Sequence, residues 1–71
     1  MEIRLAERVK ELRKDVGISQ AKLAEIISVD KAFIGHIENG KSRVSVETLI
    51  LLAKHFDVSA DYLLGLKDTY H

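Results

Sequence analysis

Hydrogen-bond donors and positive charges gather in one short part of this 71-residue chain. Lys31, His36, Asn39, Lys41 and Arg43 all lie within a stretch little longer than one short helix and its following turn. Side chains of this kind bind an anionic or polar surface, and none of them is an activated nucleophile or a paired carboxylate. The segment therefore predicts a recognition surface rather than a catalytic site.

The other residues with catalytic or metal-binding chemistry are isolated from one another. The three histidines form no pair at metal-ligand spacing, and the chain has no cysteine. Ser19, Ser45 and Ser59 stand where helix N-caps are expected, with no base placed to activate them. A glycine-rich phosphate loop is also missing. We therefore expect no enzymatic activity, no metal and no cofactor.

The elements that must position the donors are helices throughout. The chain lacks proline, and its apolar residues recur at helical spacing over residues 3–14, 20–27, 30–39, 46–56 and 60–64. Ser and Asp residues precede four of these segments as expected N-caps, and Gly17, Gly40 and Gly65 are expected to end helices. Short helices joined by short turns predict a compact, five-helix, all-α domain.

The apolar stripes of these helices form the expected core. Each stripe repeats every three or four residues, so its members share one helix face. The expected core residues are Leu5, Val9, Leu12, Val16, Leu23, Ala24, Ile27, Phe33, Ile34, Ile37, Leu49, Leu52, Ala53 and Phe56.

The helix over residues 30–39 has two contrasting faces. Its apolar side chains lie on the inner side. The outer side is flat and edged with donors, and comprises Lys31, Ala32, Gly35, His36 and Asn39. An interior glycine costs about 1 kcal/mol relative to alanine. Gly35 is therefore either a means of lying close to a partner surface or a tolerated surface glycine without a role.

Two of the helices stand at the spacing of a helix-turn-helix, residues 20–39. A short turn separates them, and the small Ala24 lets them cross closely. The segments GISQAKLA, IENGK, VETLILLAKHFDVS and DYLLG together resemble the lambda-repressor-like, Cro/repressor-type helix-turn-helix family. The resemblance runs from about Leu5 to Gly65. It implies a five-helix DNA-binding domain that binds operators as a dimer and regulates transcription.

The resemblance also assigns roles to individual positions. Lys31, Ala32 and His36 occupy the base-reading positions of the recognition helix, and Gly35 lies beside them. Lys31 can donate to guanine or meet a phosphate, and the methyl group of Ala32 can touch a thymine methyl group. Contacts with the DNA backbone fall to Gln20, Asn39, Lys41 and Arg43.

A further pair of positions implies a structural contact. Arg13 and Glu38 match positions that form an ion pair beneath the DNA-binding face of the family. Three residues depart from the family pattern. Ser28 replaces the usual turn glycine, which costs about 1 kcal/mol if the residue is left-handed. Val44 replaces a frequent proline, and Phe33 replaces a small or polar residue. Phe33 is expected at the edge of the core, with contact with DNA sugars as the alternative.

The expected function is sequence-specific binding of double-stranded DNA by a small transcriptional regulator of the phage- or prophage-repressor type. The recognition helix 30–39 would enter the major groove. The operator is expected to be an inverted repeat bound by a homodimer, at least on DNA. The candidate dimer surface comprises Tyr62, Leu63, Leu66 and Tyr70.

Zero net charge keeps a second class of function open. An antitoxin or protein-interaction module on the same fold would have a protein as its main partner. The expected domain covers residues 1–66, with a C-terminal tail at 67–71. No apolar run reaches the length of a membrane span, and the charged start is unlike a secretory signal, so a cytoplasmic location is expected. Because the sequence indicates no second domain, we expect no small-molecule sensor.

Overall fold

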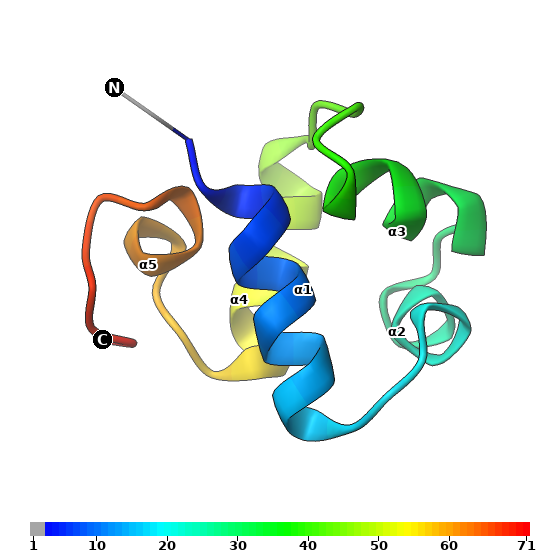
Figure 1. Ribbon diagram of the computed structural model, residues 1–71, viewed down its shortest axis with the longest axis horizontal. Coiled ribbons are helices and arrows are strands. Elements are labelled where there is room, and N and C mark those ends of the chain that lie inside the picture. The colour runs from blue at the N-terminus through cyan, green and yellow to red at the C-terminus, as the bar shows by residue number, and fades with distance from the viewer. Residues whose placement is uncertain (1–2) are drawn as a thin grey trace.

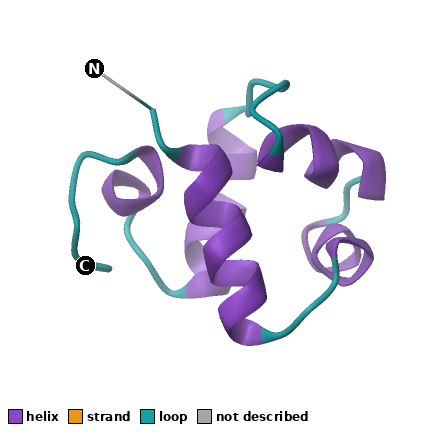
Figure 2. Ribbon diagram, viewed as in Figure 1, coloured by secondary structure: helices purple, strands orange, loops and turns teal. Residues whose placement is uncertain are grey.

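The computed structural model describes residues 3–71, and within that range it consists of five helices joined by short loops (Figures 1 and 2). The order of elements is α1 (Leu5–Val16), α2 (Gln20–Ile27), α3 (Lys31–Glu38), α4 (Val46–Phe56) and α5 (Ala60–Leu64). The helices α2 and α3 lie on one side of α1, and α5 lies on the other side (Figure 1). The predicted all-α, five-helix architecture is confirmed.

Serine side chains fix the start of three helices. The hydroxyl oxygens of Ser19, Ser45 and Ser59 accept hydrogen bonds from the backbone N–H groups three residues later, at 3.0–3.1 Å. Each bond satisfies one of the donors that a helix leaves free at its N-terminus. These three predicted caps are confirmed.

The expected cap at Asp30 is only half right. Asp30 occupies the N-cap position of α3, but its side chain makes no capping hydrogen bond. The backbone carbonyl of Asp30 instead accepts from the N–H of Phe33, at 3.0 Å. That amide is the one that a capping side chain would bond, so the tight first turn of α3 leaves the Asp30 carboxylate without this role.

The C-terminal end of α1 differs from the prediction. The helix runs from Leu5 to Val16 rather than over 3–14, and Val16, expected in the core, is 58% exposed. Gly17 adopts the left-handed conformation, and Ile18 donates its N–H to the carbonyl of Arg13. The chain therefore turns back within one residue, and Ile18 packs against the core in place of Val16.

The core lies where the inner faces of all five helices meet. Six side chains in it are essentially inaccessible: Val9, Leu23, Ile34, Ile37, Leu52 and Leu63. Phe33, Leu49, Ala53 and Phe56 are partly buried against this cluster. The prediction that Phe33 lies at the core edge is confirmed, and with the exception of Val16 the expected core residues are buried or packed against the core.

The last residues pack against the domain through a buried arginine. The guanidinium of Arg8 lies 4.1 Å from the centre of the Tyr62 ring and 3.2 Å from a carboxylate oxygen of Asp68. The ring of Tyr70 meets Tyr62 edge to face, and its carbonyl accepts from the N–H of Ser59. Cation–π contact and an ion pair together explain how an arginine can be 7% exposed.

This packing corrects the expected dimer surface. Tyr62 is 6% exposed and Leu63 is fully buried, so neither side chain is available to a second subunit. Arg8 and Tyr70 cover the ring of Tyr62, which is why the sequence pattern alone misplaced it. Leu66 and Tyr70 remain about half exposed. None of the helices in residues 3–71 combines the length and the apolar character that crossing a membrane requires.

Candidate nucleic-acid interface

The turn between α2 and α3 sets the angle at which the two helices meet. Ser28 ends α2 in the left-handed conformation, with φ 60° and ψ 47°. The N–H groups of Ser28 and Val29 donate to carbonyls of the last turn of α2. Left-handed geometry costs a residue with a side chain about 1 kcal/mol, and these hydrogen bonds offset it. Ser28 is therefore left-handed, the case for which the sequence argument expected that cost.

A small side chain sits where α2 crosses α3. Ala24 is 3% exposed and lies in the core cluster with Ile27 and Ile34. A larger residue at Ala24 would push the two helices apart, because protein cores have no spare volume at such crossings. The helix-turn-helix is consequently a rigid pair that presents one face of α3 to the outside.

The helix α3 has the two faces that the sequence predicts. Ile34 and Ile37 are buried, whereas Lys31, Ala32 and His36 are exposed. Its first turn carries no acidic residue, and Glu38, its acidic residue, is turned inward. The outer face of α3 therefore presents Lys31, His36 and a flat strip at Ala32.

Gly35 lies nearer to α2 than the helical-face argument implied. It is half-buried, and an added Cβ atom would meet only the side-chain oxygen of Gln20, at 3.9 Å. That distance is ordinary van der Waals contact, so the fold itself does not require a glycine here. The absence of a side chain keeps the corner between the start of α2 and the middle of α3 open.

A buried polar network joins α1, α2 and α3 beneath this face. Arg13 donates from Nε and Nη2 to the two carboxylate oxygens of Glu38, at 2.7 and 3.0 Å. Gln20 donates to Oε1 of Glu38 at 3.3 Å, and Arg13 also donates to the carbonyl of Ile18. The expected Arg13–Glu38 ion pair is thus present, with side chains 12% and 3% exposed.

The network controls the charge of Glu38. Burial by itself would raise the pKa of this carboxyl group, but the hydrogen bonds from Arg13 and Gln20 outweigh it and lower the pKa below its ordinary value. The Glu38 side chain is therefore a carboxylate at neutral pH, fully paired by its two partners. Because Gln20 is one of them, the network also fixes the residue at the start of α2.

The loop that follows α3 holds the remaining predicted contacts. Asn39 ends the helix, and Lys41 donates its N–H to the carbonyl of His36 at 2.8 Å, which folds the loop against α3. Lys41 and Arg43 are exposed, and neither forms an ion pair within residues 3–71. Their charges are therefore available to an anionic partner.

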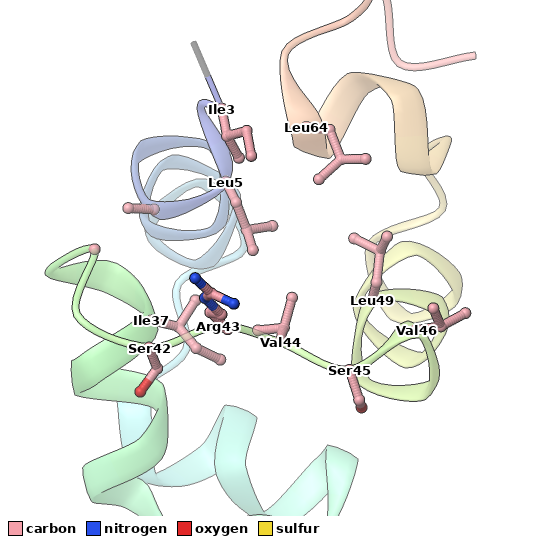
Figure 3. Close-up of a pocket in the computed structure, with 12 residues that line it drawn as sticks. Ile3, Leu5, Ile37, Ser42, Arg43, Val44, Ser45, Val46, Leu49 and Leu64 are labelled. Atoms are coloured by element: carbon pink, nitrogen blue, oxygen red, sulfur yellow. The ribbon is translucent and has the colours of Figure 1, made fainter. Parts of the chain in front are cut away.

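Residues 3–71 hold no group of three or more His, Cys, Asp or Glu side chains placed to bind a metal ion. The sequence argument missed one feature nearby. Arg43 also lines an open-sided pocket of about 560 Å³ between α1, α4 and α5 (Figure 3). No periodicity could have indicated it, because its walls come from distant parts of the chain.

Known proteins resemble this chain over most of its length. The control protein C.SmaI of Serratia marcescens is 40% identical over 67 residues, which cover 90% of this chain and 80% of that protein. The helix-turn-helix transcriptional regulator YobD of Bacillus subtilis is 37% identical over 62 residues. That match covers 87% of this chain but 55% of YobD, so the chain spans about half the length of this relative.

Solved structures share the fold at a similar level of identity. The restriction-modification controller protein C.AhdI of Aeromonas hydrophila has a TM-score of 0.78 and 31% identity, covering 86% of this chain and 92% of its own. The P22 c2 repressor, solved with a synthetic operator, has a TM-score of 0.81 and 33% identity, covering 84% and 91%. A family profile described as Helix-turn-helix matches residues 9–63. The chain therefore belongs to the Cro/C1-type helix-turn-helix family.

Proposed function

We propose that this protein is a sequence-specific regulator of transcription that inserts α3 into the major groove of double-stranded DNA. The observation that carries the proposal is the outward face of α3, held rigid by the Arg13–Glu38–Gln20 network. The major groove is about 12 Å wide and admits one helix. In this arrangement the side chains that face the base edges are those of Lys31, Ala32 and His36, with Gly35 beside them.

The residues around α3 are assigned to the sugar-phosphate backbone. They comprise Gln20 at the start of α2 and Asn39, Lys41 and Arg43 in the following loop. Such contacts fix the register of a protein on DNA without reading its sequence. The P22 c2 repressor, which resembles this chain, was solved with operator DNA, and this supports the assignment.

Salt dependence tests the two loop cations. We expect Lys41→Gln and Arg43→Gln each to reduce the slope of log K against log salt concentration by about one unit, because each removes one neutralised phosphate. Fluorescence anisotropy with a labelled duplex at several salt concentrations measures the slope. Lys67→Gln, in the tail, is the matched control and should leave it unchanged. An unchanged slope in both loop variants would remove these residues from the interface.

Gly35→Ala separates the two interpretations of the helix glycine. The structure has room for the methyl group, so we expect thermal unfolding to show a gain of about 1 kcal/mol in stability. If the missing side chain lets α3 lie close to the bases, the same variant binds its operator more weakly. Higher stability with unchanged operator affinity would mean that Gly35 has no role in binding.

Selection of binding sites from randomised duplexes tests the function itself. We expect an inverted repeat with half-site centres about one helical turn apart, bound by two copies of the chain. Leu66 and Tyr70 remain candidates for the contact between copies, and exposed Ile50 and Leu51 of α4 add to them. Sedimentation of the complex gives the stoichiometry. One copy on an isolated half-site would contradict the dimer.

A protein-interaction module is the alternative function. The net charge is zero, and only one of the base-reading positions, Lys31, carries a full positive charge. Both features argue against binding of nucleic acid through charge alone and keep a protein partner as the alternative. The same selection decides between the two. If no sequence is enriched and binding is weak at physiological salt, the DNA-binding proposal fails and a protein partner takes its place.

A further inference from the structure

A pocket beside Arg43 is a feature of the described surface whose other lining residues have no part in the proposed DNA contacts. Its walls come from the start of α1, the end of α3, the loop before α4, the first turns of α4 and the end of α5. Figure 3 shows Leu5, Val44, Leu49 and Leu64 facing one shared space. A volume of about 560 Å³ lies within the range that small organic ligands occupy in proteins.

The chemistry of the walls is uneven. Apolar side chains make up most of the lining, and among the described residues that line it Arg43 is the one that carries a charge. The hydroxyl of Ser45, at the rim, is already committed to the N-terminus of α4 and to Thr48. Arg43 itself makes no hydrogen bond or ion pair within residues 3–71. The pocket thus combines an apolar interior with one unpaired cation.

We propose that this pocket binds an apolar monocarboxylate, whose hydrocarbon part lies among Leu5, Val44, Leu49 and Leu64 and whose carboxylate pairs with Arg43. A guanidinium can donate two parallel hydrogen bonds to a carboxylate, which matches its charge and shape. A phosphate dianion would retain one uncompensated charge here, because the part of the wall formed by residues 3–71 contains no second cation. Burial of the hydrocarbon in the apolar walls provides the remaining affinity.

The ligand would act on DNA binding through Arg43, and this part of the inference depends on the proposed function. Arg43 is assigned to the sugar-phosphate backbone, and its single positive charge cannot neutralise both a DNA phosphate and a carboxylate in the pocket. The ligand and the operator therefore compete for Arg43. By thermodynamic linkage each weakens the binding of the other by the same factor. The sequence argument expected no small-molecule sensor because it considered only a separate domain.

Titration of the full chain with octanoate, in the absence of DNA, tests the site. We expect saturable shifts of amide resonances at Leu5, Val44, Leu49 and Leu64, with octanol, the neutral analogue, binding about tenfold more weakly. Arg43→Gln should weaken octanoate binding about tenfold without affecting octanol. Lys41→Gln is the matched control, since Lys41 does not line the pocket, and it should bind octanoate normally.

Three results would overturn the site. They are equal affinities for octanoate and octanol, no effect of Arg43→Gln on octanoate binding, or the same resonances shifting when the protein alone is concentrated, which would mean that a second copy covers the pocket.

Operator binding with and without octanoate then tests the competition. Octanoate should weaken operator binding by the unmodified chain and by Lys41→Gln, but not by Arg43→Gln. If octanoate binds and operator affinity does not change, the competition is wrong. If no DNA binds at all, the proposed function fails while the ligand titration still stands.

Discussion

Glu38→Ala is expected to lower the free energy of unfolding by about 3 kcal/mol, because it leaves Arg13 and Gln20 without their common acceptor in a buried setting. A domain of this size has a stability near the lower end of the usual range, about 5 kcal/mol, so the loss is large. Urea unfolding followed by circular dichroism measures it. Glu25→Ala is the matched control, since Glu25 is exposed and lies 3.8 Å from Lys22.

The same carboxylate predicts how stability depends on pH. The pKa of Glu38 is lowered in the folded protein, although burial opposes the shift, because Arg13 and Gln20 hold the charged form. A carboxyl group with a lowered pKa contributes its stabilisation fully above its unfolded value, 4.5, and loses it as the pH falls further. Wild-type stability should therefore decrease below pH 4.5, and Glu38→Ala should flatten part of that decrease. If the stability of the wild-type protein and that of Glu38→Ala fall in parallel as the pH decreases, Glu38 is not the group responsible.

Local patterns predicted the helices and their faces well because the signals are themselves local. Ser19, Ser45 and Ser59 cap helices through residues three positions away. The position of Arg8 could not be predicted in this way. Its partners are Tyr62 and, 60 positions along the chain, Asp68, so nothing in the spacing around Arg8 indicates that it is buried.

The candidate site shows the same division. The resemblance located the Arg13–Glu38 pair, which the structure contains, and the outward direction of Lys31 followed from helical geometry. The contact between Gln20 and Glu38, and the corner that Gly35 leaves open, depend on how α2 crosses α3. That crossing is a tertiary feature, and no periodicity within either helix contains it.

Two residues of α3, exposed Lys31 and half-buried Gly35, act against the stability of their own helix. Gly35 is a poor helix former, and Lys31 places a positive charge in the first turn, where the helix dipole favours an acid. Neither is needed for packing, because Lys31 is exposed and a methyl group fits at Gly35. Binding of an anionic surface would account for Lys31, and a close approach to DNA would account for Gly35, whereas a tolerated surface glycine without a role is the alternative that Gly35→Ala tests.

Lys31→Glu should therefore raise the stability of the domain and weaken its binding to the operator. We expect the helix to gain about 0.5 kcal/mol, because an acid in the first turn of α3 interacts well with the dipole. Operator affinity should fall on the order of hundredfold, since a negative charge would face the DNA at the centre of the interface. Anisotropy titrations and thermal unfolding measure the two effects, and Lys67→Glu controls for charge reversal elsewhere. Loss of both stability and binding would mean that the variant is misfolded and that Lys31 has a structural role.

Lys31→Gln then distinguishes the two contacts that Lys31 can make. If its ammonium group meets a phosphate, affinity should fall evenly across operator sequences and the salt slope should decrease by about one unit. If it donates to a guanine, the loss should concentrate on one base pair, where the preference relaxes by about 1–3 kcal/mol. Measuring the variant on operators with each base pair substituted in turn resolves the two, because only a base contact ties the energetic loss to a position in the DNA.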